Sequence, residues 1–180
     1  MTEKTLLYRI SLKSLISAGI IAMAVALPQI VHIFAGATGG VRWLPMYLPV
    51  LLGGCLLGWR WGLGIGVLSP VISFLLTLAS GNPMPALARL PFMIAELAVI
   101  AAVAGMFGKK IEKDVRFALL AALLALIAGR SVLMLASVIF QSVTPFTPAV
   151  IWAQIKDGLL GAALHIILVP LIVAAVRVRK

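Results

Sequence analysis

The stretch Phe117–Phe140 reads FALLAALLALIAGRSVLMLASVIF and contains a single charged residue, Arg130. Because a helix needs about 20 apolar residues to cross the hydrocarbon core of a bilayer, this segment is long enough to span a membrane. Five further apolar stretches flank it, separated by turns rich in Gly, Pro or charge. The sequence therefore predicts six transmembrane helices, at about residues 12–33, 44–58, 62–79, 87–107, 117–140 and 150–176.

The composition supports an all-α integral membrane bundle. Of the 180 residues, 63% are hydrophobic and 11% are charged, where a soluble domain carries about 25% charged residues. The six helices and their short loops use nearly the whole chain, which predicts one transmembrane domain over residues 1–180. Glu3 makes the N-terminus atypical of a signal peptide, so we expect the first apolar stretch to be retained as a helix.

The net charge of +10 indicates an orientation rather than a nucleic-acid partner. Cytoplasmic loops of membrane proteins collect Lys and Arg. With both termini cytoplasmic, eleven of the fifteen basic residues lie on the cytoplasmic side, whereas Arg42 and Arg89 lie near the outer side. The eleven are Lys4, Arg9, Lys13, Arg60, Lys109, Lys110, Lys113, Arg116, Arg177, Arg179 and Lys180.

A stripe of small residues runs along the first helix. Ser14, Ala18, Ala22 and Ala26 recur every four positions and so share one face. Small residues allow the close approach that drives helix association in lipid. The stripe predicts either a docking face for a partner helix or packing within this chain.

Four ionisable residues fall inside the expected helices: Glu96, Arg130, Lys156 and Asp157. A charge in the middle of a transmembrane helix is costly, so it usually has a partner or a function. At 1.5 Å per residue, all four are expected roughly 10–15 Å below the outer surface. They predict either a structural Glu96–Arg130 salt bridge or a polar pocket that opens to the outside and is closed toward the cytoplasm.

A ring of polar and aromatic residues lies near the expected outer face. Taken singly, Trp and Tyr at such positions are typical interfacial anchors. Together these residues could roof a pocket and stack on a flat ligand. The ring consists of His32, Arg42, Trp43, Tyr47, Asn82, Arg89, Gln141, Trp152 and Gln154.

Several kinds of chemistry have no counterpart in the sequence. His32 and His165 are the two histidines, and no Cys, His and acid cluster has the spacing of metal ligands. There is neither a Gly-rich phosphate loop ending in Lys-Ser or Lys-Thr nor a GxSxG motif. We therefore expect no catalytic residues, no bound metal and no ATP hydrolysis by this chain.

Three apolar, Gly- and Pro-containing runs resemble a known family. They are Leu44–Gly54 (LPMYLPVLLGG), Gly62–Ser73 (GLGIGVLSPVIS) and Pro91–Gly105 (PFMIAELAVIAAVAG). Together with Ala18-x-x-x-Ala22, the chain length and the helix count, they resemble the substrate-binding subunits (S components) of energy-coupling factor (ECF) transporters.

The resemblance implies a prokaryotic plasma-membrane protein that captures a vitamin or cofactor precursor from outside with high affinity. It implies docking, through the alanine stripe, on a transmembrane coupling subunit that works with two cytoplasmic ATPases; ATP is used by those partners, and this chain binds no cofactor. It also implies a lid at loop Ala35–Trp43 and a ligand held by helices 4 to 6. The ligand stays open among benzimidazole- or ribazole-like, pyridoxine-like and pantothenate-like compounds, and the mixed charges beside Trp43 and Trp152 favour a small polar ring compound.

A second interpretation is a non-transporting membrane scaffold, similar to the small rod-shape-determining membrane proteins. Under it, Glu96 and Arg130 are structural and no small molecule binds. The Gly-rich stretch at residues 36–43 and the common level of the four charges favour the transport interpretation.

Overall fold

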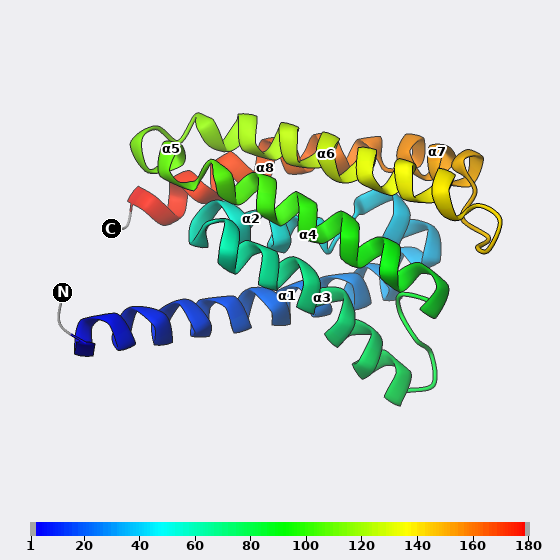
Figure 1. Ribbon diagram of the computed structural model, residues 1–180, viewed down its shortest axis with the longest axis horizontal. Helices are drawn as coiled ribbons and strands as arrows, with labels where there is room; N and C mark the ends of the chain where they lie inside the picture. Colours follow the sequence, from blue (N-terminus) through cyan, green and yellow to red (C-terminus); the bar gives the residue numbers. More distant parts are fainter. Residues whose placement is uncertain (1–2, 179–180) are drawn as a thin grey trace.

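In the computed structural model (Figure 1), six helical segments are long and apolar enough to cross a membrane, as the sequence predicts. The structure describes the backbone of residues 3–178 and the side chains of residues 12–36 and 38–176. Within that part every regular element is helical. The elements are α1 (Glu3–Trp43), α2 (Tyr47–Leu57), α3 (Trp59–Ala79), η1 (Leu87–Arg89), α4 (Leu90–Met106), α5 (Gly108–Lys113), α6 (Phe117–Phe140), α7 (Pro148–Asp157) and α8 (Leu159–Val178).

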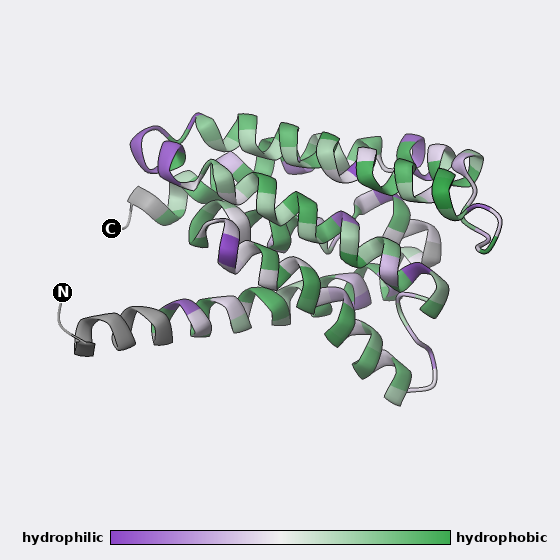
Figure 2. Ribbon diagram, viewed as in Figure 1, coloured by the Kyte–Doolittle hydropathy of each residue, from purple (hydrophilic) through white to green (hydrophobic). Residues whose placement is uncertain are grey.

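Helix α4 lies at the centre of the bundle. It packs on α2, α3 and α6, while α8 packs on α6 and α2, and α1 packs on α2 and α3. Both chain ends and α5 lie at one end of the bundle, called here the α5 end (Figure 1). The loops 80–86 and 141–147 lie at the opposite end, the loop end. Hydrophobic residues cover most of the helix lengths, and hydrophilic residues gather around α5 (Figure 2).

The contact between α3 and α4 depends on a glycine. A Cβ atom built on Gly66 would lie 2.5 Å from the Leu97 carbonyl oxygen, so the two backbones touch directly there. Such close approach is how small residues drive helix packing in lipid. Gly64 lies on nearly the opposite face of the same helix, and it has no neighbour within 4 Å of its Cβ position.

The expected loop at residues 36–43 is helical in the structure, and this part of the prediction was wrong. Helix α1 continues to Trp43 with one non-helical residue, Gly36, at φ 63° and ψ −168°. Glycine adopts a positive φ without steric cost, so it reorients the chain in a single residue. A Cβ on Gly40 would lie 2.8 Å from His32 Nε2, which shows that the segment after the kink folds back on α1.

The predicted last helix, residues 150–176, is also two helices. Helix α7 ends at Asp157, and α8 begins at Leu159 after a break at Gly158. Glycine weakens a helix interior by roughly 1 kcal/mol relative to alanine, so Gly158 and the following Gly161 favour such a break. The part of this segment that is long and apolar enough to cross a membrane is Leu159–Val176, so Lys156 and Asp157 precede it.

Smaller differences concern the turns. The residues Trp59–Trp61, expected as a turn, form the first turn of α3, because the reversal is made by Gly58 alone at φ 85°. The charged loop 108–116 contains the short helix α5. Helix α6 has the bounds that the sequence predicts.

The described basic residues of the charge-bias prediction gather mainly at the α5 end. Lys109, Lys110 and Lys113 lie on or beside α5, and Arg116 follows it, all with exposed side chains. The side chains of Lys4, Arg9, Arg177, Arg179 and Lys180 lie outside the described residues.

We expect Gly66→Ala to destabilise the protein by about 1–3 kcal/mol, because the added methyl group meets the α4 backbone. Gly64→Ala is the matched control, since it adds the same group to the same helix in open space. The measurement is the temperature at which the detergent-solubilised protein loses its monodisperse size-exclusion peak. Equal melting temperatures for the two variants would contradict the close contact.

Candidate functional site

A cavity of about 240 Å³ lies among the helices near the loop end. Its walls come from α1, the 40–47 segment, α3, the loop before η1, and the start of α4. Apolar side chains, including Met46, Met84 and Met93, supply much of its surface. Its polar side chains are His32, Tyr47, Ser73, Arg89 and Glu96.

One helix face supplies both charged groups of the cavity. Arg89, Met93 and Glu96 are spaced i, i+4 and i+7, which places them along a single face of the segment entering α4. At 1.5 Å per residue, Arg89 and Glu96 are separated by about 10 Å along the axis. The cavity therefore has a cation toward its loop end and a carboxylate at its inner end.

Glu96 is compensated from the neighbouring helix α6. Arg130 Nη1 lies 3.1 Å from Glu96 Oε1, and both side chains are largely buried. This is the one ion pair among the residues whose side chains the structure describes. The predicted salt bridge is thus confirmed, and its acidic member, Glu96, also lines the cavity.

Tyr47 on α2 completes this cluster. Its hydroxyl lies within hydrogen-bonding reach of the Glu96 carboxylate, and the Arg130 guanidinium carbon lies 5.1 Å from the centre of its ring. Cation–π contacts of this kind are worth more when they are desolvated. Three helices, α2, α4 and α6, therefore meet at one polar cluster.

The cluster retains unused hydrogen-bonding capacity. Both side chains of the ion pair are largely buried, and the second terminal nitrogen of the guanidinium, Arg130 Nη2, is buried with no hydrogen-bond partner among the described residues. An ionised carboxylate accepts about four hydrogen bonds, and Tyr47 and Arg130 do not use all of them. The Glu96 carboxylate can therefore accept a donor that enters the cavity.

The loop wall of the cavity is fixed to α3 by two hydroxyl groups. Ser73 Oγ donates to the Met84 carbonyl oxygen at 2.9 Å, and Thr77 Oγ1 accepts from the Met84 amide at 2.7 Å. The sequence prediction did not include Ser73 or Met84. The signal was available in the i, i+4 pair of hydroxyl residues, which is unusual in so apolar a helix and is followed by a Pro-rich turn.

The wall formed by residues 40–43 packs directly on the last two helices. A Cβ on Gly161 of α8 would lie 2.6 Å from the Arg42 carbonyl oxygen, and one on Gly158 would lie 3.2 Å from the Val41 carbonyl oxygen and 3.1 Å from Arg130 Nη2. The cavity wall and the α7–α8 junction are thus in backbone contact.

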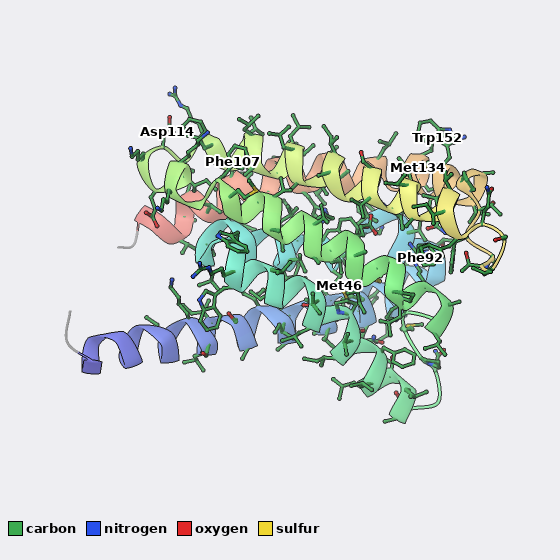
Figure 3. All side chains as sticks on the ribbon, viewed as in Figure 1. Met46, Phe92, Phe107, Asp114, Met134 and Trp152 are labelled. Atoms are coloured by element: carbon green, nitrogen blue, oxygen red, sulfur yellow. The ribbon has the colours of Figure 1, made fainter. Side chains whose placement is uncertain are left out.

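The structure divides the predicted site residues into three groups. His32, Tyr47, Arg89 and Glu96 line the cavity, and Arg130 lies directly behind it. Trp43 and Trp152 are exposed and line no described cavity; Trp152 projects from the outside of the bundle, whereas Met46 lies inside it (Figure 3). The remaining four, Arg42, Gln154, Lys156 and Asp157, border a separate depression beside the 38–42 segment.

The four charges that the sequence predicts at one level do not line one cavity. Lys156 and Asp157 are exposed at the end of α7 and border the separate depression, although the next residue, Gly158, lies close to Arg130 Nη2. The physical reason is the direction of the side chains: Gly158 is buried and faces Arg130, whereas Lys156 and Asp157 lie on the exposed side of the same turn. The expected aromatic roof of Trp43 and Trp152 is likewise absent from this cavity.

A match to a family model supports this architecture. The model describes the substrate-specific component of ECF transporters, and it matches residues 13–173. The chain belongs to this family. No curated protein and no solved structure shows significant similarity to the chain.

As an ECF substrate-specific component, the protein is a transporter subunit that recognises a substrate, not an enzyme. Within the described residues, no group of three His, Cys, Asp or Glu side chains could hold a metal ion. The lid expected at Ala35–Trp43 is instead the kinked end of α1, whose residues Gly40 and Val41 line the cavity.

Replacing Arg130 with methionine should strongly destabilise the protein, because Glu96 is then left as a buried carboxylate without a counter-charge. Such a loss costs about 3–5 kcal/mol. The double variant Glu96→Gln, Arg130→Met should recover much of it, and the exposed Arg42→Gln should change little. Melting temperatures in detergent form the double-mutant cycle; additive losses would show that the two residues are not coupled.

Proposed function

We propose that this protein captures a vitamin or cofactor precursor from outside the cell and delivers it through an ATP-driven ECF module. The observation that carries the proposal is the small cavity that ends on the Glu96, Arg130 and Tyr47 cluster. Ligand sites are mostly apolar hollows with a few polar groups that fix the ligand's orientation. This cavity has that composition, and its Glu96 carboxylate can accept further hydrogen bonds.

The proposed orientation puts both termini and α5 in the cytoplasm. The exposed basic residues on and around α5 support it through the positive-inside rule. The loop end then faces outward, in the plasma membrane of a prokaryote. A ligand would reach the cavity from that side and meet Glu96 about 10 Å below Arg89.

The small-residue stripe of α1 supports the proposed coupling step. Ser14, Ala18, Ala22 and Ala26 are all exposed, which leaves this face of α1 accessible in the part of the chain that the structure describes. The opposite face of α1 packs inward through Ser17, Ile20 and Ala24. We propose that the stripe contacts the transmembrane coupling subunit, which joins two cytoplasmic ATPases that use ATP.

The scaffold alternative explains the ion pair but not the cavity beside it. A purely structural Glu96–Arg130 pair is better sheltered when apolar side chains surround it on every side, because water access weakens the attraction. Here the carboxylate borders a hollow. The cavity therefore favours ligand binding.

The binding proposal is tested by mass spectrometry of small molecules released from the purified, detergent-solubilised protein. We expect a stoichiometric vitamin-like compound. If the protein is empty and also binds none of a panel of vitamins and their precursors in equilibrium dialysis, the binding proposal is wrong.

The coupling proposal is tested by Ala22→Trp. We expect loss of substrate uptake in cells that also produce the ECF module, with ligand binding by the purified variant unchanged, because the indole blocks close helix approach. The control is Ala163→Trp, which places the same bulk at an exposed position of α8. Normal uptake by Ala22→Trp would contradict the docking face.

A further inference from the structure

The charges around the cavity do not cancel. Glu96 is compensated by Arg130, which approaches it from α6 behind the cavity. Arg89 lines the cavity without a carboxylate partner among the described side chains. The other described acids lie elsewhere: Glu112 and Asp114 at the α5 end, and Asp157 at the separate depression. The cavity is therefore left with one uncompensated positive charge.

Arg89 is held in a way that leaves its donors available. Its guanidinium carbon lies 5.8 Å from the centre of the Phe146 ring. Stacking on an aromatic face orients a guanidinium but uses none of its in-plane N–H groups. A half-buried guanidinium oriented in this way is suited to a bidentate pair with a carboxylate.

We propose that the ligand is a compact monocarboxylic acid with a hydrogen-bond donor at its far end, its carboxylate on Arg89 and its donor on Glu96. This inference rests on the proposed binding function and specifies its substrate class. The donor end follows from the Glu96 carboxylate, which lines the cavity and has more acceptor sites than Arg130 and Tyr47 use. The backbone positions of Arg89 and Glu96 are about 10 Å apart along the helix axis, which sets the approximate length of a ligand that contacts both.

The charge balance selects one negative charge. A single guanidinium neutralises a monocarboxylate, whereas a phosphate dianion or a dicarboxylate would leave a charge uncompensated near the membrane interior, which is costly. A cationic ligand would add to the charge of Arg89. The middle of the ligand contacts thioether and apolar groups such as Met46, Met84 and Met93, so it is expected to be uncharged.

The cavity volume sets an upper size. About 240 Å³ lies below the roughly 300–1,000 Å³ of sites for drug-sized ligands. An acid with an extended chain or a small ring fits this volume. Large fused-ring compounds do not.

The test compares acids with neutral analogues that differ only at the acid group. Two matched pairs serve as probes: pantothenate with panthenol, and biotin with biotin amide. Thiamine is the cationic probe. The compound released from the purified protein is compared with its methyl ester. Binding is measured by equilibrium dialysis on the detergent-solubilised full chain. The variants are Arg89→Gln, Arg89→Lys, which keeps the charge, and Arg42→Gln, which removes an arginine outside the cavity.

We expect the acid form to bind and its neutral analogue to bind about 10- to 100-fold more weakly, as loss of a charge-assisted hydrogen bond predicts. Arg89→Gln should weaken binding of the acid by a similar factor and reduce the discrimination between the acid and its analogue. Arg89→Lys should weaken binding of the acid less. Arg42→Gln should leave binding unchanged. Melting temperatures verify that the variants are folded.

Two other results are decisive and differ from each other. A released compound that is neutral or cationic, or an acid whose affinity does not depend on Arg89, overturns the assignment of the substrate class while the binding function stands. A protein that releases nothing and binds none of the probes overturns the binding function itself, and the substrate class with it.

Discussion

The ion pair between Glu96 and Arg130 is the constraint on which the rest of the structure depends. A carboxylate in the middle of a membrane helix is tolerated only with a partner, so α4 and α6 must meet in the one register that brings these two side chains together. Tyr47 then joins α2 to the same point. Apolar packing could hold these helices together at a lower desolvation cost, and the carboxylate's place at the end of a cavity gives a reason for keeping it.

The cavity itself is built from elements that meet this cluster from the loop end. Loop 80–86 is fixed by the Ser73 and Thr77 hydroxyl groups, and the kink at Gly36 brings the end of α1 across the opposite side. Neither element adds a charged side chain to the cavity lining. They enclose the space between Arg89 and Glu96, and the low polarity of that enclosure is what makes each remaining polar contact strong.

The sequence was sufficient for the parts of the fold that depend on apolar length. The bounds of α6 and the number of membrane-spanning helices follow from runs of apolar residues, and the Glu96–Arg130 pair follows from their depth in the bilayer. What the sequence did not reveal depends on single glycines. Gly36 makes a kink after which a stretch that resembles a loop is helical, and Gly158 divides a stretch that resembles one helix. Composition does not distinguish these outcomes, because they are decided by tertiary contacts, so the sequence did not show that Lys156, Asp157, Trp43 and Trp152 lie outside the cavity.

The backbone contact at Gly161 has a mechanical consequence. Side chains between two helices can absorb a small displacement by changing rotamer, whereas here the carbonyl group of Arg42 lies directly against the α8 backbone. Packed interfaces of this kind do not deform continuously. A shift of the 40–43 wall when a ligand fills the cavity would therefore pass undamped into α8, which runs from the loop end to the end where the chain terminates (Figure 1). Binding of a ligand in the cavity can in this way shift α8 at the opposite end of the bundle without any change in the ion pair at the centre.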